Sequence, residues 1–150
     1  MAKVRLTKEF SFEAAHALED YDGACRQIHG HSYRLFVTVL GEPIADQTVS
    51  SYGMVIDFGD LKRVVNEQIV SRLDHALVLR RSALSDRVID GIGYIYSNIL
   101  LTDYQPTCEN MLIDFADRIS QHLPSGVVLY SLKLHETATS FAEWYLVDNQ

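Results

Sequence analysis

Two stretches near the N-terminus, in which apolar and polar residues alternate, constrain the fold most. From Val4 to His16 the even-numbered residues are apolar, apart from Lys8 and the terminal histidine, whereas the odd-numbered residues up to Glu13 are polar. The stretch from His29 to Leu40 has the same two-residue period. This period is typical of a strand with one buried face. Two such strands joined by a turn-rich loop predict an antiparallel hairpin.

Two later segments have the spacing of helices instead. From Asp57 to Leu73 the apolar residues fall on one side of a helix, and Asp57 is suited to cap its N-terminus. A second helix is predicted after Pro106, with Thr107 as its cap, and Pro124-Ser125-Gly126 ends it.

Two more strands, at residues 128–136 and 141–147, close the chain. The order strand, strand, helix, helix, strand, strand predicts an α+β fold, with two helices on one face of a four-stranded antiparallel sheet. We expect residues 1–150 to form one domain, which is the usual size for this length. Residues 80–105 contain scattered apolar residues, and their pattern does not decide between a short helix and an interaction loop.

The charge and the cysteine count exclude several classes of protein. A net charge of −7 argues against a nucleic-acid partner or an anionic membrane surface, because both need clustered Lys and Arg. No apolar run approaches the roughly 20 residues of a membrane helix. The start of the chain, MAKVRLTKEF, has no apolar signal core, so we expect a cytoplasmic protein whose two cysteines are free thiols.

Three histidines are expected to converge at one end of the predicted hairpin. His29 and His31 lie on the same face of the second strand, and His16 ends the first strand on its buried side. Three protein ligands with one open position are typical of a catalytic zinc site. Two alternatives stay open: that two of these histidines are ordinary core or rim residues, or that Cys25 completes a closed structural site.

Four further residues are candidates for catalysis or binding. Cys25 precedes His29 by four positions, so its thiol can approach the metal and become a thiolate there. Asp74 and His75 end the first helix, where a carboxylate can orient an imidazole, although a histidine at a helix end is also a common terminus. Glu136 lies on the apolar face of its strand and needs a donor partner there, unless the end of the strand is exposed. The second cysteine, Cys108, is interpreted as a packing residue.

Six motifs follow one another along the chain: Phe12-Glu13-Ala14-Ala15-His16, CRQIHGHS from Cys25, GMVIDF from Gly53, Leu73-Asp74-His75, PTCEN from Pro106 and His135-Glu136-Thr137. With these motifs in this order, the chain resembles the 6-pyruvoyltetrahydropterin synthase / 6-carboxytetrahydropterin synthase family. The resemblance covers almost the whole chain, except for residues 80–105, which are a possible family-variable insertion.

The resemblance implies a role for each candidate residue. It makes His16, His29 and His31 the zinc ligands, and it makes Cys25, Asp74 and His75 the catalytic group, with Cys25 as the base. Glu136 would hold the amino-pyrimidine edge of a pterin, assisted by Thr107 and Glu109. The implied substrate is 7,8-dihydroneopterin triphosphate. The implied architecture is the tunnelling fold, usually a homohexamer of two stacked trimers with active sites between subunits.

One spacing indicates which branch of the family the chain resembles more. Three residues separate Cys25 from His29, as in the 6-carboxytetrahydropterin synthases of the 7-deazapurine (queuosine) route, whereas the pyruvoyl enzymes of tetrahydrobiopterin synthesis have a longer gap. The stretch from Ala138 to Phe141 departs from the family pattern. The alternatives are a pyruvoyl synthase and a non-catalytic paralogue that binds zinc and pterin.

Overall fold

A long antiparallel hairpin organises the protein, whose computed structural model describes residues 1–150. Strand β1 (Val4–His16) pairs with strand β2 (His29–Gly41) along its whole length. The register sets His16 opposite His29 and Ala14 opposite His31. The hairpin predicted from the alternating pattern is therefore confirmed.

The hairpin lies at the centre of a six-stranded mixed sheet with the order β4-β3-β1-β2-β5-β6. The prediction of a four-stranded, purely antiparallel sheet was wrong, because two short strands extend the sheet beyond β1 in parallel orientation. The four other strands are β3 (Ala76–Arg80), β4 (Ile99–Thr102), β5 (Val127–His135) and β6 (Phe141–Tyr145).

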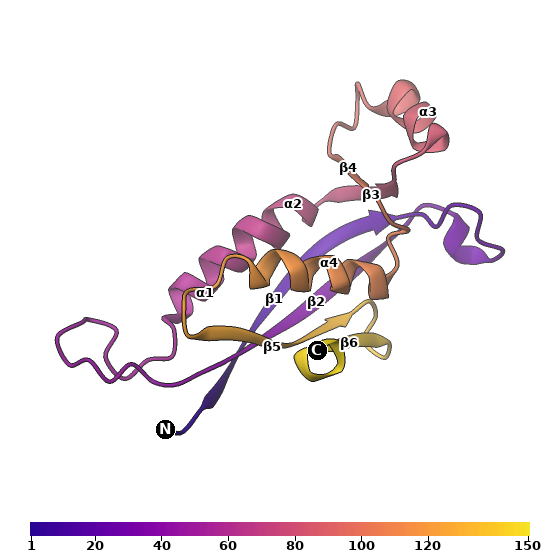
Figure 1. Cartoon of the computed structure of the whole chain (residues 1–150). Coiled ribbons are helices and arrows are strands. Elements are labelled where there is room, and N and C mark those ends of the chain that lie inside the picture. The colour runs from indigo at the N-terminus through magenta and orange to yellow at the C-terminus, as the bar shows by residue number, and fades with distance from the viewer.

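The two missed strands carry no two-residue period. Strand β3 reads ALVLR and β4 reads ILLT, and a short, continuous apolar run cannot be distinguished from a piece of helix by periodicity. Between them lies helix α3 (Ala83–Ile92), whose N-terminus is capped by Ser82. The stretch 80–105 therefore supplies a helix and an edge strand, and it lies apart from the other helices (Figure 1).

Two helical segments cover one face of the sheet, as predicted (Figure 1). The Asp57 carboxylate accepts a hydrogen bond from the Gly59 N–H at 2.6 Å, and the Thr107 hydroxyl accepts one from the Asn110 N–H at 3.2 Å, so both predicted caps are present. The first segment contains a π-helical turn. The bounds are α1 (Phe58–Val65), the π turn η2 (Asn66–Val70), α2 (Ser71–Leu73), α4 (Cys108–Ser120) and the 3₁₀ turns η1 (Ala24–Arg26) and η3 (Leu146–Asn149).

The hydrophobic core fills the space between the sheet and these helices. Phe12 of β1 stacks on Tyr33 of β2 at 5.0 Å between ring centroids and meets Phe115 of α4 edge-on at 6.2 Å. The same strand faces carry the histidines further along, so the histidines continue the row of core residues to the end of the sheet. None of the helices has the length and apolar character needed to cross a membrane.

Candidate metal centre and catalytic residues

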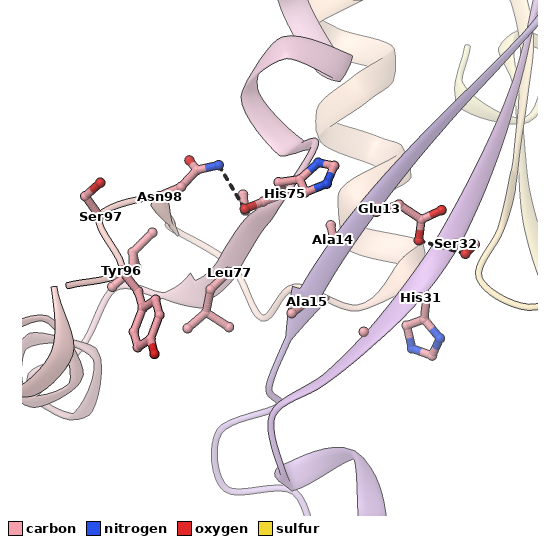
Figure 2. A pocket seen from close by; sticks show the side chains of 13 residues that line it. Glu13, Ala14, Ala15, His31, Ser32, His75, Leu77, Tyr96, Ser97 and Asn98 are labelled. Carbon is pink, nitrogen blue, oxygen red and sulfur yellow. Dashed lines mark hydrogen bonds between the residues drawn. The ribbon is translucent and has the colours of Figure 1, made fainter.

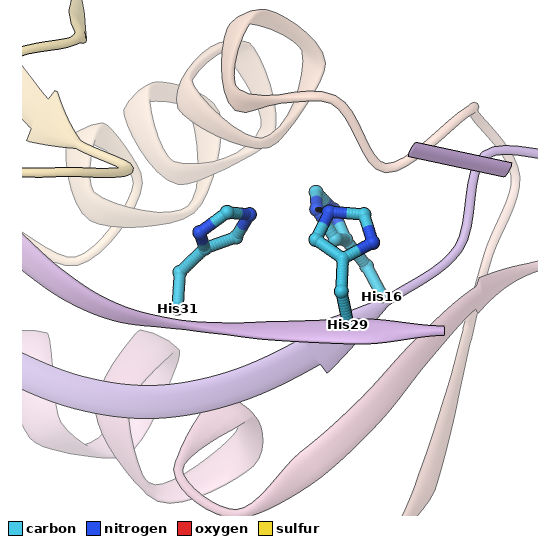
Figure 3. Close-up of side chains that lie close together, drawn as sticks. All are labelled: His16, His29 and His31. Atoms are coloured by element: carbon cyan, nitrogen blue, oxygen red, sulfur yellow. Dashed lines mark hydrogen bonds between the residues drawn. The ribbon is translucent and has the colours of Figure 1, made fainter. Parts of the chain in front are cut away.

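The hairpin brings the three predicted histidines together on the helix-covered face of the sheet (Figure 3). His16 is the last residue of β1, His29 is the first residue of β2, and His31 follows two positions later. Their ring centroids are 4.5 to 5.2 Å apart, and one potential ligand atom from each lies within 4.8 Å of the others. The alternating pattern alone was enough to predict this convergence.

Backbone carbonyls orient two of the three rings. His16 Nδ1 lies 2.7 Å from the Pro106 carbonyl oxygen, and His29 Nδ1 lies 2.7 Å from the Gln27 carbonyl oxygen. Because a carbonyl only accepts, both Nδ1 atoms carry a proton, and in a neutral ring Nε2 is then a bare acceptor. The two Nε2 atoms face each other at 3.0 Å. A tetrahedral zinc holds neighbouring imidazole nitrogens about 3.3 Å apart, so this arrangement is close to that of two zinc ligands.

Burial favours the neutral form of His16 and His31, which is the form that binds metals. Removal from water lowers the pKa of His16 and also that of His31, and it outweighs the opposite effect of the nearby Glu136 carboxylate. The His31 Nε2 atom is buried and has no hydrogen-bond partner. A cation shared by the three Nε2 atoms would satisfy this atom and remove the repulsion between the other two lone pairs. The three histidines therefore fit a metal ion such as zinc.

Glu136 lies closer to the histidines than the sequence indicated. It follows the last residue of β5, and its Oε1 atom is 3.6 Å from His16 Nε2 and 3.7 Å from His31 Nε2. Its side chain is 28% exposed. The carboxylate thus belongs to the same cluster as the histidines, with part of its surface open to a ligand.

Two buried residues, Tyr33 and Cys108, lie next to the cluster. The sequence pattern predicted no role at the metal site for either of them. The Tyr33 ring centroid is 5.5 Å from that of His31, and its hydroxyl is buried without a partner. Burial raises the pKa of Tyr33, so this hydroxyl stays protonated. Burial also raises the pKa of Cys108 to about 12, and its thiol faces the Leu134 carbonyl oxygen at 3.3 Å. The position of Tyr33, two residues after His31 on the same strand face, is the signal that could have identified it.

Cys25 lies outside the cluster of ligand atoms. It occupies the exposed 3₁₀ turn η1 between the two strands of the hairpin, and its carbonyl accepts a hydrogen bond from the Leu18 N–H at 2.9 Å. Its sulfur is not among the atoms that lie within 4.8 Å of one another. The structure therefore gives no support to a closed structural site with Cys25 as the fourth ligand.

Asp74 and His75 form a pair that is anchored to β1 away from the histidine cluster. His75 Nδ1 lies 3.1 Å from the Asp74 carboxylate, which also accepts a hydrogen bond from the Glu13 N–H at 2.9 Å. That backbone bond, followed by the contact with His75, lowers the pKa of Asp74. His75 has a positive φ of 63°, and the Asn98 amide donates to its carbonyl oxygen.

The His75 side chain, 78% exposed, lines an open cavity of about 570 Å³. Glu13 and Ser32 also line it, and their side chains have the opposite parity to the buried strand residues. In Figure 2 strand β1 passes between His75 and His31. The polar contacts of Asp74 and His75 are with each other, Glu13 and Asn98, so one chain does not bring this pair to the histidines.

Thr107 and Glu109 open helix α4 beside the cluster. The Thr107 hydroxyl is used as the helix cap, and the preceding residue, Pro106, supplies the carbonyl that orients His16. Glu109 is exposed in the first turn of the helix. Pro106 therefore links the start of α4 to His16.

The sequence is similar to known pterin synthases over most of its length. A family model described as 6-pyruvoyl tetrahydropterin synthase matches residues 5–146. The chain is 30% identical to a 6-carboxy-5,6,7,8-tetrahydropterin synthase of Haemophilus influenzae, over 93% of this chain and 97% of the relative. It is 33% identical to the protein of that name from Synechocystis, over 92% and 90% of the two chains.

Solved structures show the same fold. The 6-pyruvoyl tetrahydropterin synthase of Caenorhabditis elegans superposes with a TM-score of 0.68 at 25% identity, covering 97% of this chain and 96% of that one. An uncharacterized protein of Wolinella succinogenes, at 20% identity, shares the fold with a TM-score of 0.78. The chain belongs to the 6-pyruvoyl tetrahydropterin synthase family and has its tunnelling fold.

Proposed function

We propose that the protein is a zinc-dependent 6-carboxy-5,6,7,8-tetrahydropterin synthase. It converts 7,8-dihydroneopterin triphosphate and water to 6-carboxytetrahydropterin, acetaldehyde and triphosphate, as a step towards queuosine and other 7-deazapurines. The proposal is supported by the relatives of that name, which match over more than nine-tenths of the chain, and by the three residues between Cys25 and His29.

The observation that carries the proposal is the convergence of three imidazoles whose Nε2 atoms lack other donors. His16 and His29 are fixed by carbonyls at their Nδ1 atoms, and His31 Nε2 is buried without a partner. These residues would hold the zinc ion. Zinc supplies Lewis-acid chemistry at such a site, which makes the carbon–hydrogen bond beside a substrate hydroxyl more acidic.

Cys25 is proposed as the base that takes this proton. Its exposed turn connects the two strand ends that carry His16 and His29, and we propose that from there the thiol acts on a side chain held at the histidines. Asp74 and His75 form the acid/base partner. The lowered pKa of Asp74 keeps its carboxylate ionised at neutral pH, and an ionised carboxylate 3.1 Å from Nδ1 orients the imidazole.

Glu136 is proposed to hold the amino-pyrimidine edge of the pterin. A carboxylate can accept two parallel N–H bonds from such an edge. Thr107 and Glu109 would assist from the start of α4. Binding the ring beside the cluster aims its side chain at the histidines, which is the positioning that the reaction requires.

We propose a homo-oligomer, the family's hexamer, in which the sites are completed across subunits. The support is physical, because Asp74 and His75 make their polar contacts away from the histidines of their own chain. A neighbouring copy could present its own exposed pair to the open end of the cluster. The edge strands β4 and β6 also leave unpaired backbone groups that a partner can cover.

Identifying the product formed from dihydroneopterin triphosphate tests the proposed function. Mass spectrometry after incubation of the zinc-loaded protein with dihydroneopterin triphosphate should detect 6-carboxytetrahydropterin, and a coupled assay should detect equimolar acetaldehyde. Recovery of 6-pyruvoyltetrahydropterin without acetaldehyde would place the protein in the biopterin branch instead. Tight pterin binding without turnover would favour a non-catalytic paralogue.

A further inference from the structure

The Glu136 carboxylate has no cation from the protein beside it. The Lys and Arg ion pairs of the structure all involve other carboxylates, and the groups that could be charged within 4.0 Å of Glu136 are His16 and His31. A carboxylate that is less than one-third exposed and has no Lys or Arg beside it is costly unless something else neutralises it.

The histidine cluster contains three nitrogen atoms, one Nε2 from each ring, that have neither a hydrogen-bond donor nor a cation as partner. Two Nε2 lone pairs oppose each other at 3.0 Å, and the His31 Nε2 atom is buried without a partner. A single divalent cation held by the three histidines would satisfy their Nε2 atoms, and Glu136 Oε1 lies beside two of these atoms. The distances from Oε1 to two Nε2 atoms, 3.6 and 3.7 Å, are close to the separation of about 3.3 Å between neighbouring ligand atoms of a tetrahedral zinc.

We propose that Glu136 is the fourth ligand of the resting metal centre and has to leave it when substrate binds. The second half of this inference rests on the proposed function, in which the same carboxylate holds the pterin ring. Glu136 would then have two positions. At rest it closes the coordination sphere, and in the substrate complex it turns to the pterin and leaves the metal open to the substrate's hydroxyls.

The local structure allows this movement without a change in the fold. Glu136 lies in the turn between β5 and β6, where its backbone N–H donates to the Ser140 carbonyl at 3.1 Å and the Thr137 hydroxyl accepts from the Ser140 N–H at 3.1 Å. The turn is therefore held by hydrogen bonds that do not involve the Glu136 side chain. Rotation about the side-chain bonds of Glu136 is enough to exchange one position for the other.

Cobalt(II) titration of the metal-free protein tests the resting position without any turnover. Glu136→Gln should weaken cobalt binding about 10- to 100-fold, as expected for loss of one group from a metal site, and should change the visible absorption bands of the bound ion. Glu143→Gln removes an exposed carboxylate on the neighbouring strand β6 and should leave both properties unchanged. Equal cobalt affinity and equal spectra for Glu136→Gln and the unaltered protein would overturn the proposal, as would failure of the unaltered protein to bind cobalt at pH 8.

Addition of neopterin, a pterin with a hydroxylated side chain, tests the exchange. The cobalt spectrum of the unaltered protein should shift as the carboxylate leaves, and the shift should be smaller in Glu136→Gln, whose metal already lacks that ligand. An identical shift in both proteins would overturn the exchange. The cobalt measurements without pterin do not depend on the reaction, so an inactive protein that still shows the Glu136 effect would count against the proposed function alone.

Discussion

The histidine cluster and the Asp74–His75 pair differ in how the chain holds them. The cluster lies on a buried strand face, and carbonyls of Pro106 and Gln27 fix two of its rings. The pair lies at the end of a helix, is largely exposed, and borders an open cavity. The three histidines converge within a single chain, whereas the polar contacts of Asp74 and His75 are with each other, Glu13 and Asn98.

This difference indicates whether metal binding and turnover should belong to the single chain or to the assembly. In the proposed function, metal binding depends on groups that the hairpin brings together, so we expect it to be a property of each chain. The proposed turnover depends on groups that one chain leaves apart, so we expect it to be a property of the assembly. Substitutions in the two regions should therefore have separable effects.

The largest effect is expected from His31→Ala. Removing the ligand whose Nε2 atom is buried without a partner should lower the zinc content from about one ion per chain to near zero and abolish activity. Metal analysis of the purified protein measures this. The control is His122→Ala, which removes an exposed histidine that contacts only the Arg118 carbonyl and should keep its zinc. An active, zinc-free His31→Ala protein would contradict the assignment of the metal site.

Cys25→Ala should separate zinc binding from turnover, because the variant should keep its zinc and lose its activity. The expected loss is about 10²- to 10⁴-fold, the usual contribution of a general base. Paired metal analysis and product assay are the measurements. The matched control is Cys108→Ala, whose buried thiol, with a pKa of about 12, is expected to matter only for packing. Loss of both zinc and activity in Cys25→Ala would support the alternative in which Cys25 is the fourth ligand of a closed structural site.

Mixing two inactive variants tests completion of the site across subunits. Cys25→Ala and His75→Ala should each be inactive, and dissociation and reassembly of an equimolar mixture should restore about a quarter of the activity, because random pairing gives some interfaces with both intact residues. Sedimentation should show a mass several times the 17.0 kDa of one chain. A monomer that is fully active would remove the basis for this prediction.

The smallest effect concerns the stability of the metal-free protein in acid. The pKa values of His16 and His31 are lowered by burial, whereas an unfolded histidine titrates near 6.5. Below that pH the unfolded chain binds more protons, so the free energy of unfolding should fall as the pH drops, by up to about 1.4 kcal/mol per pH unit for each histidine. Urea unfolding between pH 7.5 and 5.5 measures this.

The controls for the acid effect come from both regions. His31→Asn should make the decline shallower, because one of the two buried groups is gone. His75→Ala should leave the decline unchanged, because this histidine is exposed. A decline that is equally steep in all three proteins would show that the buried histidines are not its cause.

The hairpin, the position of the histidines and both helix caps could be predicted from local patterns in the sequence. A two-residue period in β1 and β2 indicates that alternate side chains face a core, and this period alone assigned His16, His29 and His31 to one face of the sheet. The caps at Asp57 and Thr107 were predictable for a similar reason, because they depend on neighbours within three residues.

Features that depend on residues distant in the chain could not be predicted from the sequence pattern. Strands β3 and β4 are recognised by their pairing with β1 and with each other, since their short apolar runs have no period of their own. The Pro106 carbonyl that orients His16 is 90 residues away, and the approach of Glu136 to the histidines depends on how β5 pairs with β2. The separation of Asp74 and His75 from the cluster likewise follows from packing, which a local pattern cannot encode.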